Sequence, residues 1–122
     1  ISQETTFERD LRYLNELEPV LHELTEGLCR ILERRQLQAH TVMVKLRTPD
    51  FSRHTRQRRF TPADHRYATL YPLARALLAR WLEENPGQPL RLLGVGARDF
   101  AAAGQIGLPF GQEGQELYAP EL

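Results

Sequence analysis

The residues best suited to chemistry form a basic ribbon from Thr41 to Phe60, TVMVKLRTPDFSRHTRQRRF. From Ala39 to Thr61 the chain has six lysines and arginines against one acid, Asp50, which gives a local charge of about +5 in a chain of zero formal net charge. A positive patch on a neutral protein is typical of a surface that binds phosphates. The arginines of a solvated hairpin can also serve only to prevent edge-to-edge pairing of sheets. Both interpretations stay open on the local pattern.

The ribbon has the pattern of two strands joined by a turn. Its first half alternates between two sets of side chains, Val42, Val44 and Leu46 on one side and Met43, Lys45 and Arg47 on the other. Because successive side chains of a strand point to opposite faces, we expect one apolar face and one polar, basic face. Residues 48–52 have turn composition, and residues 54–60 carry three more arginines, Arg56, Arg58 and Arg59.

Length and composition indicate one globular domain. The chain has 122 residues, 41% hydrophobic and 26% charged, which is enough for one core but not for two. It has no apolar run of about 20 residues that could span a membrane, and no signal peptide. Because it starts at Ile1 without a methionine, we expect a piece of a longer protein. The single cysteine, Cys29, is expected to be a core residue of a cytosolic protein.

A first helix is predicted over about residues 16–36. Its apolar stripe has three- and four-residue spacing and consists of Leu17, Leu21, Leu24, Leu28 and Ile31, with Leu32 alongside. Asn15 is the expected N-cap, and Pro19 is tolerable only in the first turn.

A second helix is predicted over about residues 69–84. Its stripe consists of Leu70, Leu73, Ala74, Leu77 and Trp81, with Leu78 and Leu82 alongside. Thr69 is expected to cap it, and residues 85–87 (NPG) to end it.

The remaining segments supply two more strands. Residues 1–7 have strand composition, residues 8–13 read as a charged connector and residues 61–68 as a loop. Residues 90–97 predict a short last strand, in which the apolar parity changes. Either both faces are covered there, or a bulge occurs at Gly94.

The order of elements is β-α-β-β-α-β, which predicts an α+β fold with a split β-α-β arrangement. Both helices would cover one face of a four-stranded sheet. The other face would stay open and carry Met43, Lys45 and Arg47. Residues 1–100 would form this domain, and residues 101–122, which have no sustained period, a flexible tail.

Motifs for catalysis are missing from this chain. The four histidines and Cys29 lack the spacing of metal ligands, and Gly94-Val95-Gly96 lacks the following helix of a phosphate loop. Two-metal phosphoryl transfer needs acids that converge from strands, and the strands offer only Glu4. We therefore expect no catalytic residue, metal site or cofactor in these residues.

Three stretches carry a family resemblance: ISQETTFERDL (1–11), the basic ribbon (41–60) and PLRLLGVGARDF (89–100). In order and spacing, residues 1–100 resemble the little-finger domain of Y-family translesion DNA polymerases, closest to the bacterial polymerase IV branch. The resemblance implies a sheet whose open face contacts the backbone phosphates of the template-primer duplex. It also implies a DNA-directed DNA polymerase, a nucleotidyltransferase, whose catalytic carboxylates and Mg²⁺ belong to other domains. The resemblance further implies a monomer that is located in the bacterial cytoplasm and associated with the nucleoid.

The resemblance and the charge pattern together assign residues to DNA. The family pattern matches at His40, Thr55, Arg56, Arg58 and Arg91, and the basic positions Lys45, Arg47, Arg53 and Arg98 complete the predicted set. Relatives often keep further basic residues in the last strand, where this chain has Leu92 and Gly96. We therefore expect a smaller contribution from that strand than in those relatives, with Arg98 compensating in part.

The tail has a second motif. Residues 105–110 resemble the hexapeptide by which bacterial polymerases bind the β sliding clamp, and its expected contacts are Gln105, Ile106, Leu108, Pro109 and Phe110. An extended segment of this kind inserts apolar anchors into a groove while the glutamine orients it. The alternative is a disordered tail with incidental hydrophobic residues.

Three other functions compete with this interpretation. An RNA-binding module of the same topology would need aromatic rings on its open face, where this sequence has Met43, Lys45 and Arg47. A small ferredoxin-like enzyme or ligand-binding domain would need a convergent polar pocket. The same domain of a catalytically inactive Y-family adaptor would have the same sequence features.

Overall fold

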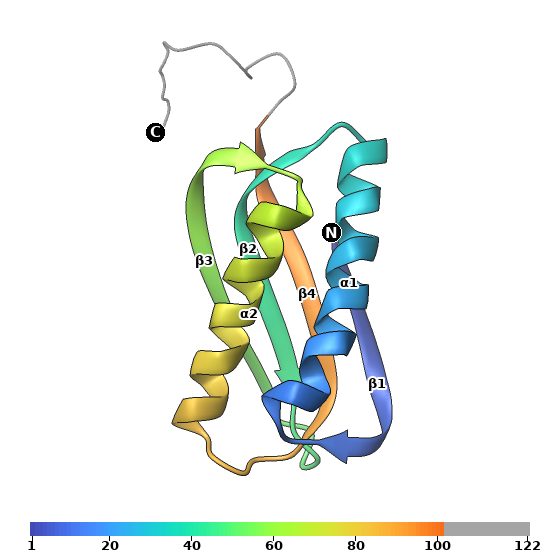
Figure 1. The fold of residues 1–122 in the computed structure, drawn as a ribbon, viewed down its shortest axis with the longest axis vertical. Coiled ribbons are helices and arrows are strands. Elements are labelled where there is room, and N and C mark those ends of the chain that lie inside the picture. The colour runs from blue at the N-terminus through green and yellow to red at the C-terminus, as the bar shows by residue number, and fades with distance from the viewer. Residues whose placement is uncertain (102–122) are drawn as a thin grey trace.

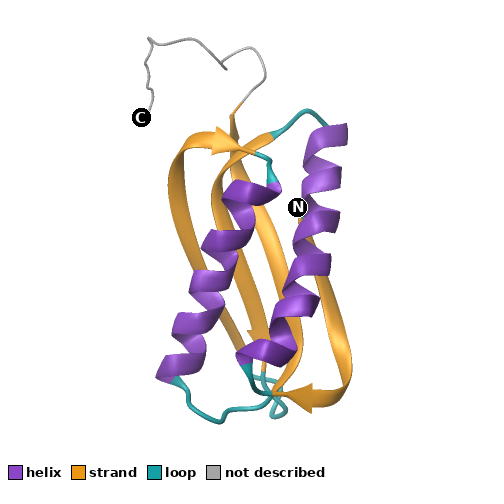
Figure 2. Ribbon diagram, viewed as in Figure 1, coloured by secondary structure: helices purple, strands orange, loops and turns teal. Residues whose placement is uncertain are grey.

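Six elements follow one another along residues 1–101, the part of the chain that the computed structural model describes: β1 (Ser2–Leu11), α1 (Leu14–Arg34), β2 (Gln38–Arg47), β3 (Arg53–Asp64), α2 (Tyr67–Glu84) and β4 (Leu90–Ala101). The strands form one antiparallel sheet in the order β1-β4-β2-β3. Both helices lie side by side on one face of this sheet (Figure 1) and leave the other face uncovered (Figure 2). The predicted architecture is confirmed.

The connection from β1 through α1 to β2 is a split β-α-β unit, because β4 lies between the two strands that it joins. β4 pairs with β1 on one side, from Ser2 opposite Gly96 to Thr6 opposite Leu92. On the other side it pairs with the whole length of β2, so β4 and β2 are the two central strands. β1 and β3 are the edges.

The core lies between the sheet and the helices. The helix-facing side chains of β2, Val42 and Val44, are fully buried and Leu46 is 2% exposed. The two helices contribute buried residues at three- and four-residue intervals: Leu17, Leu21, Thr25, Leu28, Leu32, Leu70, Ala74, Leu78 and Trp81. Four of the predicted stripe residues are only partly buried: Leu24, Ile31, Leu73 and Leu77. The observed stripes follow the helical period through Thr25, Leu32 and Leu78 instead.

Cys29 packs against the edge of this core, and burial raises the pKa of its thiol to about 11. The thiol is therefore protonated at neutral pH and a weak nucleophile. Within residues 1–101, neither helix is both long and apolar enough to cross a membrane.

The start of α1 differs from the prediction. The helix begins at Leu14 with Tyr13 as N-cap, so the expected cap at Asn15 is wrong. Glu16 explains the shift: its Oε1 accepts the backbone N–H groups of Arg12 and Tyr13, each at 3.2 Å. These are donors that a helix N-terminus otherwise leaves without partners. Pro19 consequently lies in the second turn of the helix and not in the first.

All four strands are longer than predicted. β1 runs through most of the expected connector to Leu11, and β3 continues through the first half of the expected loop to Asp64. β2 begins at Gln38 and not at Thr41, and β4 continues beyond residue 97 to Ala101.

Of the two alternatives for the last strand, the bulge at Gly94 is wrong, because the pairing of β4 with β2 is unbroken at this residue. The irregularity lies instead in β1, between Thr6 and Leu11, opposite the start of β4. The other alternative holds at the change of apolar parity in β4: Leu92 on the open face is 8% exposed and Leu93 on the helix side is fully buried, so both faces are covered there.

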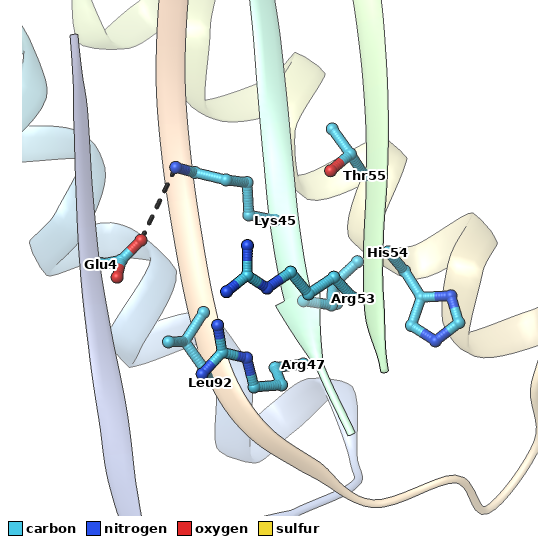
Figure 3. Close-up of a pocket in the computed structure, with 8 residues that line it drawn as sticks. Glu4, Lys45, Arg47, Arg53, His54, Thr55 and Leu92 are labelled. Atoms are coloured by element: carbon cyan, nitrogen blue, oxygen red, sulfur yellow. Dashed lines mark ion pairs between the residues drawn. The ribbon is translucent and has the colours of Figure 1, made fainter. Parts of the chain in front are cut away.

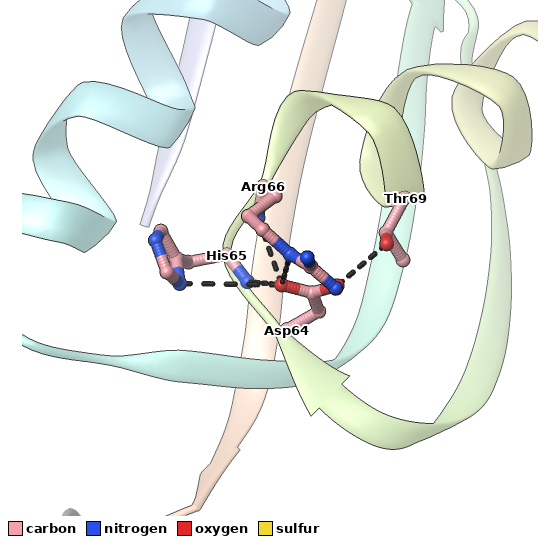
Figure 4. A network of polar contacts seen from close by, with 4 residues as sticks. All are labelled: Asp64, His65, Arg66 and Thr69. Carbon is pink, nitrogen blue, oxygen red and sulfur yellow. Dashed lines mark hydrogen bonds and ion pairs between the residues drawn. The ribbon is translucent and has the colours of Figure 1, made fainter.

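Asp64 organises the start of α2 (Figure 4). Its side chain is 8% exposed and forms an ion pair with Arg66, whose Nη2 lies 2.9 Å from Oδ2. It also accepts the backbone N–H of His65 at 2.7 Å and the hydroxyl of Thr69 at 2.5 Å. Thr69 is therefore not the N-cap that the sequence suggested; α2 begins at Tyr67, and Arg66 is the capping position. The predicted end of the helix at residues 85–87 is confirmed.

Asp64→Asn is expected to lower the free energy of unfolding by about 1–3 kcal/mol at pH 7, because the charge-assisted hydrogen bonds are lost. The hydrogen bond from Arg66 is the main cause that lowers the pKa of Asp64 below its ordinary value of 3.8. A lowered pKa in the folded state adds stability above the unfolded pKa, and this stability is lost as the pH falls below it. In urea unfolding, the difference between the two proteins should therefore shrink below about pH 4. Equal stability at pH 7, with the exposed control Glu23→Gln also unchanged, would contradict this role.

Candidate nucleic-acid interface

The uncovered face of the sheet carries the basic half of the β2 alternation. Val42, Val44 and Leu46 point to the helices, so the intervening residues Thr41, Met43, Lys45 and Arg47 point away from them. The predicted assignment of Lys45 and Arg47 to the open face is confirmed.

The register with β3 decides which arginines join them. Arg47 is opposite Arg53, Lys45 opposite Thr55 and Thr41 opposite Arg59. Because directly opposed residues of an antiparallel pair share a face, Arg53, Thr55 and Arg59 lie on the open face. On the other neighbour of β2, Arg98 of β4 is opposite Thr41 and joins the same face. Sequence reasoning missed Arg59, which has the same parity as Arg53 and Thr55.

Arg56 and Arg58 do not lie with them. They are opposite Val44 and Val42, which places them on the helix side of β3. Nη2 of Arg56 is 3.9 Å from Oε1 of Glu84 in α2. Since β3 is an edge strand, these two arginines line the edge of the sheet, and the expectation that they share the open face with Lys45 is wrong.

His40 and Arg91 are engaged locally. Nδ1 of His40 is 3.0 Å from the carbonyl oxygen of Phe60, which accepts the hydrogen bond. The Arg91 guanidinium is 3.4 Å from Oδ1 of Asp10 and 5.9 Å from the centre of the Phe51 ring. The structure therefore does not bring these two predicted DNA-binding residues together with the open-face cations.

Three of the open-face cations, Lys45, Arg47 and Arg53, line a pocket of about 310 Å³ beside the β2–β3 turn, whereas Arg59 and Arg98 do not. In Figure 3 the guanidinium groups of Arg47 and Arg53 both point toward β4, that of Arg47 ending beside Leu92, while Lys45 reaches toward Glu4. Nε of Arg47 is buried without a hydrogen-bond partner. Among residues 1–101, neither Arg47 nor Arg53 has a carboxylate within 4.0 Å. An anion with several oxygens, such as a phosphate, would supply the missing acceptors.

Two glycines of β4 leave the middle of the open face without side chains of its own. Gly94 and Gly96 of β4 are opposite Lys45 and Met43 of β2. A Cβ at residue 94 would lie 3.0 Å from Cβ of Glu4 and 3.3 Å from the backbone oxygen of Gln3. Both glycines are buried, and a Cβ at residue 96 would lie 3.2 Å from Cβ of Ser2 and 3.3 Å from Cε of Met43. Side chains of β1 and β2 therefore fill the space above β4 at both positions.

No group of three His, Cys, Asp or Glu side chains within residues 1–101 is arranged to hold a metal ion. The predicted clamp-binding residues Gln105, Ile106, Leu108, Pro109 and Phe110 lie outside the described residues.

Comparison with known proteins gives a consistent set of relatives. The family model of the impB/mucB/samB family C-terminal domain matches residues 1–109. DNA polymerase IV of Caulobacter vibrioides is 36% identical over 107 residues, which cover 88% of this chain and 26% of that protein. DNA polymerase IV of Dehalococcoides mccartyi is 38% identical over 100 residues, which cover 82% of this chain and 25% of that protein. The chain spans about a quarter of the length of these curated relatives.

Solved structures share the fold. A structure described as a complex of the beta-clamp processivity factor and the little finger domain of PolIV matches with a TM-score of 0.63 and 27% identity, over 78% of this chain and 83% of that chain. A post-insertion binary complex of Dbh DNA polymerase matches with a TM-score of 0.72 over 80% of this chain and 28% of that chain. Its 15% identity shows a common fold only.

Fold and surface together define a small α+β domain with two helices on one sheet face and a cationic, uncovered opposite face. The chain belongs to the impB/mucB/samB C-terminal domain family, the little-finger domains of Y-family DNA polymerases of the polymerase IV type, as the three sequence stretches predicted.

Gly94→Ala is expected to destabilise the domain by about 1 kcal/mol. Overpacking against β1 costs about 1–3 kcal/mol, and the lower entropy of unfolded alanine offsets up to about 1 kcal/mol of this. Urea unfolding would measure the change. Gly87→Asn is a suitable control, because Gly87 has a φ of 76° with open space around it and asparagine tolerates this conformation. A Gly94→Ala protein as stable as the wild type would show that β1 moves aside at no cost.

Proposed function

We propose that the open face binds the backbone of duplex DNA, independently of its sequence, as the accessory domain of a translesion DNA polymerase. The observation that supports it best is the convergence of Lys45, Arg47 and Arg53 on a sheet face that no helix covers. Thr55 and Arg98 would add contacts from the neighbouring strands. Arg56 and Arg58 would reach the duplex only around the edge of β3.

Contacts with phosphates suit this face better than contacts with unpaired bases. The open-face residues of β2 from Thr41 to Arg47, and the residues paired with them across β3, β4 and β1, include no aromatic side chain. Recognition of single-stranded RNA on a sheet depends on such rings, onto which bases stack. Arginine and lysine side chains instead bind the phosphates, which are the same at every sequence.

The combined variant Arg47→Ala and Arg53→Ala is expected to weaken binding to duplex DNA at least about tenfold, by the same factor for different sequences. The slope of log affinity against log salt concentration should become shallower by about 1.8, since two phosphate contacts are lost. Fluorescence anisotropy with labelled duplexes at several salt concentrations measures both.

The matched control is Arg34→Ala with Arg80→Ala, which removes two arginines from the helical layer and should leave affinity unchanged. Arg56→Ala tests the edge of β3 separately, and a smaller effect than that of Arg53→Ala is expected. Losses that depend on the base sequence, or an equal loss in the control, would contradict phosphate binding by the open face.

The polymerase activity itself would reside outside this chain. Y-family membership supports a DNA-directed DNA polymerase, with its catalytic carboxylates and Mg²⁺ in other domains. The same domain in a catalytically inactive adaptor remains the alternative. A primer-extension assay on the complete protein distinguishes them, because only the polymerase adds nucleotides.

We further propose that the tail binds the β sliding clamp through residues 105–110. This rests on the hexapeptide pattern in the sequence. It is also supported by a relative, since the little finger domain of PolIV has been solved in complex with the beta clamp. A tether of this kind raises the local concentration of a weak DNA-binding face.

Gln105→Ala combined with Phe110→Ala is expected to weaken clamp binding at least about tenfold, because a buried aromatic anchor and an orienting hydrogen bond are lost. Surface plasmon resonance with an immobilised bacterial β clamp measures the affinity. Gln112→Ala with Leu117→Ala, in the same tail but outside the motif, is the control. Unchanged affinity of the motif variant would refute docking through this hexapeptide.

A further inference from the structure

The cations of the open face differ in what they already contact. Nζ of Lys45 lies 3.6 Å from Oε1 of Glu4 and 3.5 Å from Oγ of Ser2, both on the edge strand β1. Within residues 1–101, Arg47 and Arg53 have no acidic partner. Arg59 of the same face is 3.9 Å from Oδ2 of Asp99, and Arg98 contacts Gln57. The pocket beside the β2–β3 turn therefore presents two guanidinium groups without an acidic partner and one ammonium group that is already paired.

Gly94 makes the Lys45–Glu4 pair possible. The register places Glu4, Gly94 and Lys45 in one row across β1, β4 and β2. With no side chain at the middle position, the two charged side chains meet above β4, as the dashed line in Figure 3 shows. The pair thus spans a whole strand and lies on the same face as Arg47 and Arg53.

The carboxylate of Glu4 occupies the place that a phosphate oxygen would take at Lys45. Both side chains are partly exposed, 36% for Lys45 and 51% for Glu4. Exposed pairs contribute little to stability, less than about fivefold in an equilibrium constant, so a phosphate can displace this carboxylate. Displacement nevertheless leaves the negative charge of Glu4 beside the phosphate, which opposes binding.

Building on the DNA-binding function proposed above, we propose that Glu4 is a counter-charge that limits the affinity of this face for the duplex. Arg47 and Arg53 bind phosphates first, and Lys45 contributes only after it leaves Glu4. Glu4 thereby weakens binding and reduces the number of cations that the free face presents to DNA.

Glu4→Gln is expected to raise the affinity of the 122-residue chain for a labelled random-sequence duplex about threefold to fivefold. The slope of log affinity against log salt concentration should become steeper by about 0.9, since Lys45 then acts as one additional phosphate contact. Fluorescence anisotropy over a salt series gives both values, and thermal melting confirms that the variants are folded.

Two controls separate this mechanism from a general change of charge. Glu8→Gln removes the same charge from the same strand, from a residue without an ion pair within residues 1–101, and should raise affinity less. When Lys45 is replaced by alanine, Glu4→Gln should raise the affinity for the duplex by no more than Glu8→Gln does. Equal gains from Glu4→Gln and Glu8→Gln, or a Glu4→Gln gain that persists without Lys45, would overturn the inference.

The outcomes also distinguish the two proposals. If Arg47→Ala with Arg53→Ala weakens binding while Glu4→Gln has no effect, DNA binding by this face stands and the role of Glu4 falls. If neither the wild type nor Glu4→Gln binds duplex at low salt, both proposals fall.

Discussion

Burial of one side of β2 under the helices determines which side chains of this strand lie on the open face of the sheet. Val42 and Val44 are completely buried and Leu46 nearly so, and each contributes about 1.5–3 kcal/mol from leaving water. A slip of one residue in the pairing would exchange these side chains for Met43, Lys45 and Arg47. The hydrophobic term is larger than any repulsion between neighbouring surface cations in water. The positive charges therefore gather on the outer face as a consequence of how the core packs.

The contrast between apolar and basic side chains also explains how much of the structure the sequence could predict. In β2 the alternation of apolar and basic residues was sufficient to assign each side chain to a face, and helical periodicity located both helices. β3 offers no such signal, because Arg56 and Arg58 on one side are as polar as Arg53 and Thr55 on the other. Their faces depend on the register with β2, which only the three-dimensional pairing supplies.

The predicted N-caps of the two helices were wrong for a related reason. Asn15 and Thr69 are good capping residues in isolation, but each competes with a partner that the local pattern does not reveal. Glu16 fixes the start of α1 two residues earlier, and the buried carboxylate of Asp64 accepts the hydrogen bond from the hydroxyl of Thr69. Hydrogen bonds to a charged acceptor are stronger than those between neutral groups, so the side chain of Thr69 turns to Asp64.

The register with β2 assigns the arginines of the basic hairpin to two different surfaces. Arg53 and Arg59 belong to the outward face, while Arg56 and Arg58 line an exposed sheet edge, where positive charge discourages pairing with a second sheet. One strand thus combines a surface suited to anions with protection against aggregation. Family membership alone would not have separated these two groups.

The glycines at residues 94 and 96 restrict which residues β4 can carry. The volume that a side chain would need is already filled at both positions, by Glu4 and Gln3 at residue 94 and by Ser2 and Met43 at residue 96. A larger residue at either position would have to displace neighbouring atoms of β1 or β2, so the flanking strands can gain positive charge at a lower cost in packing than β4 can.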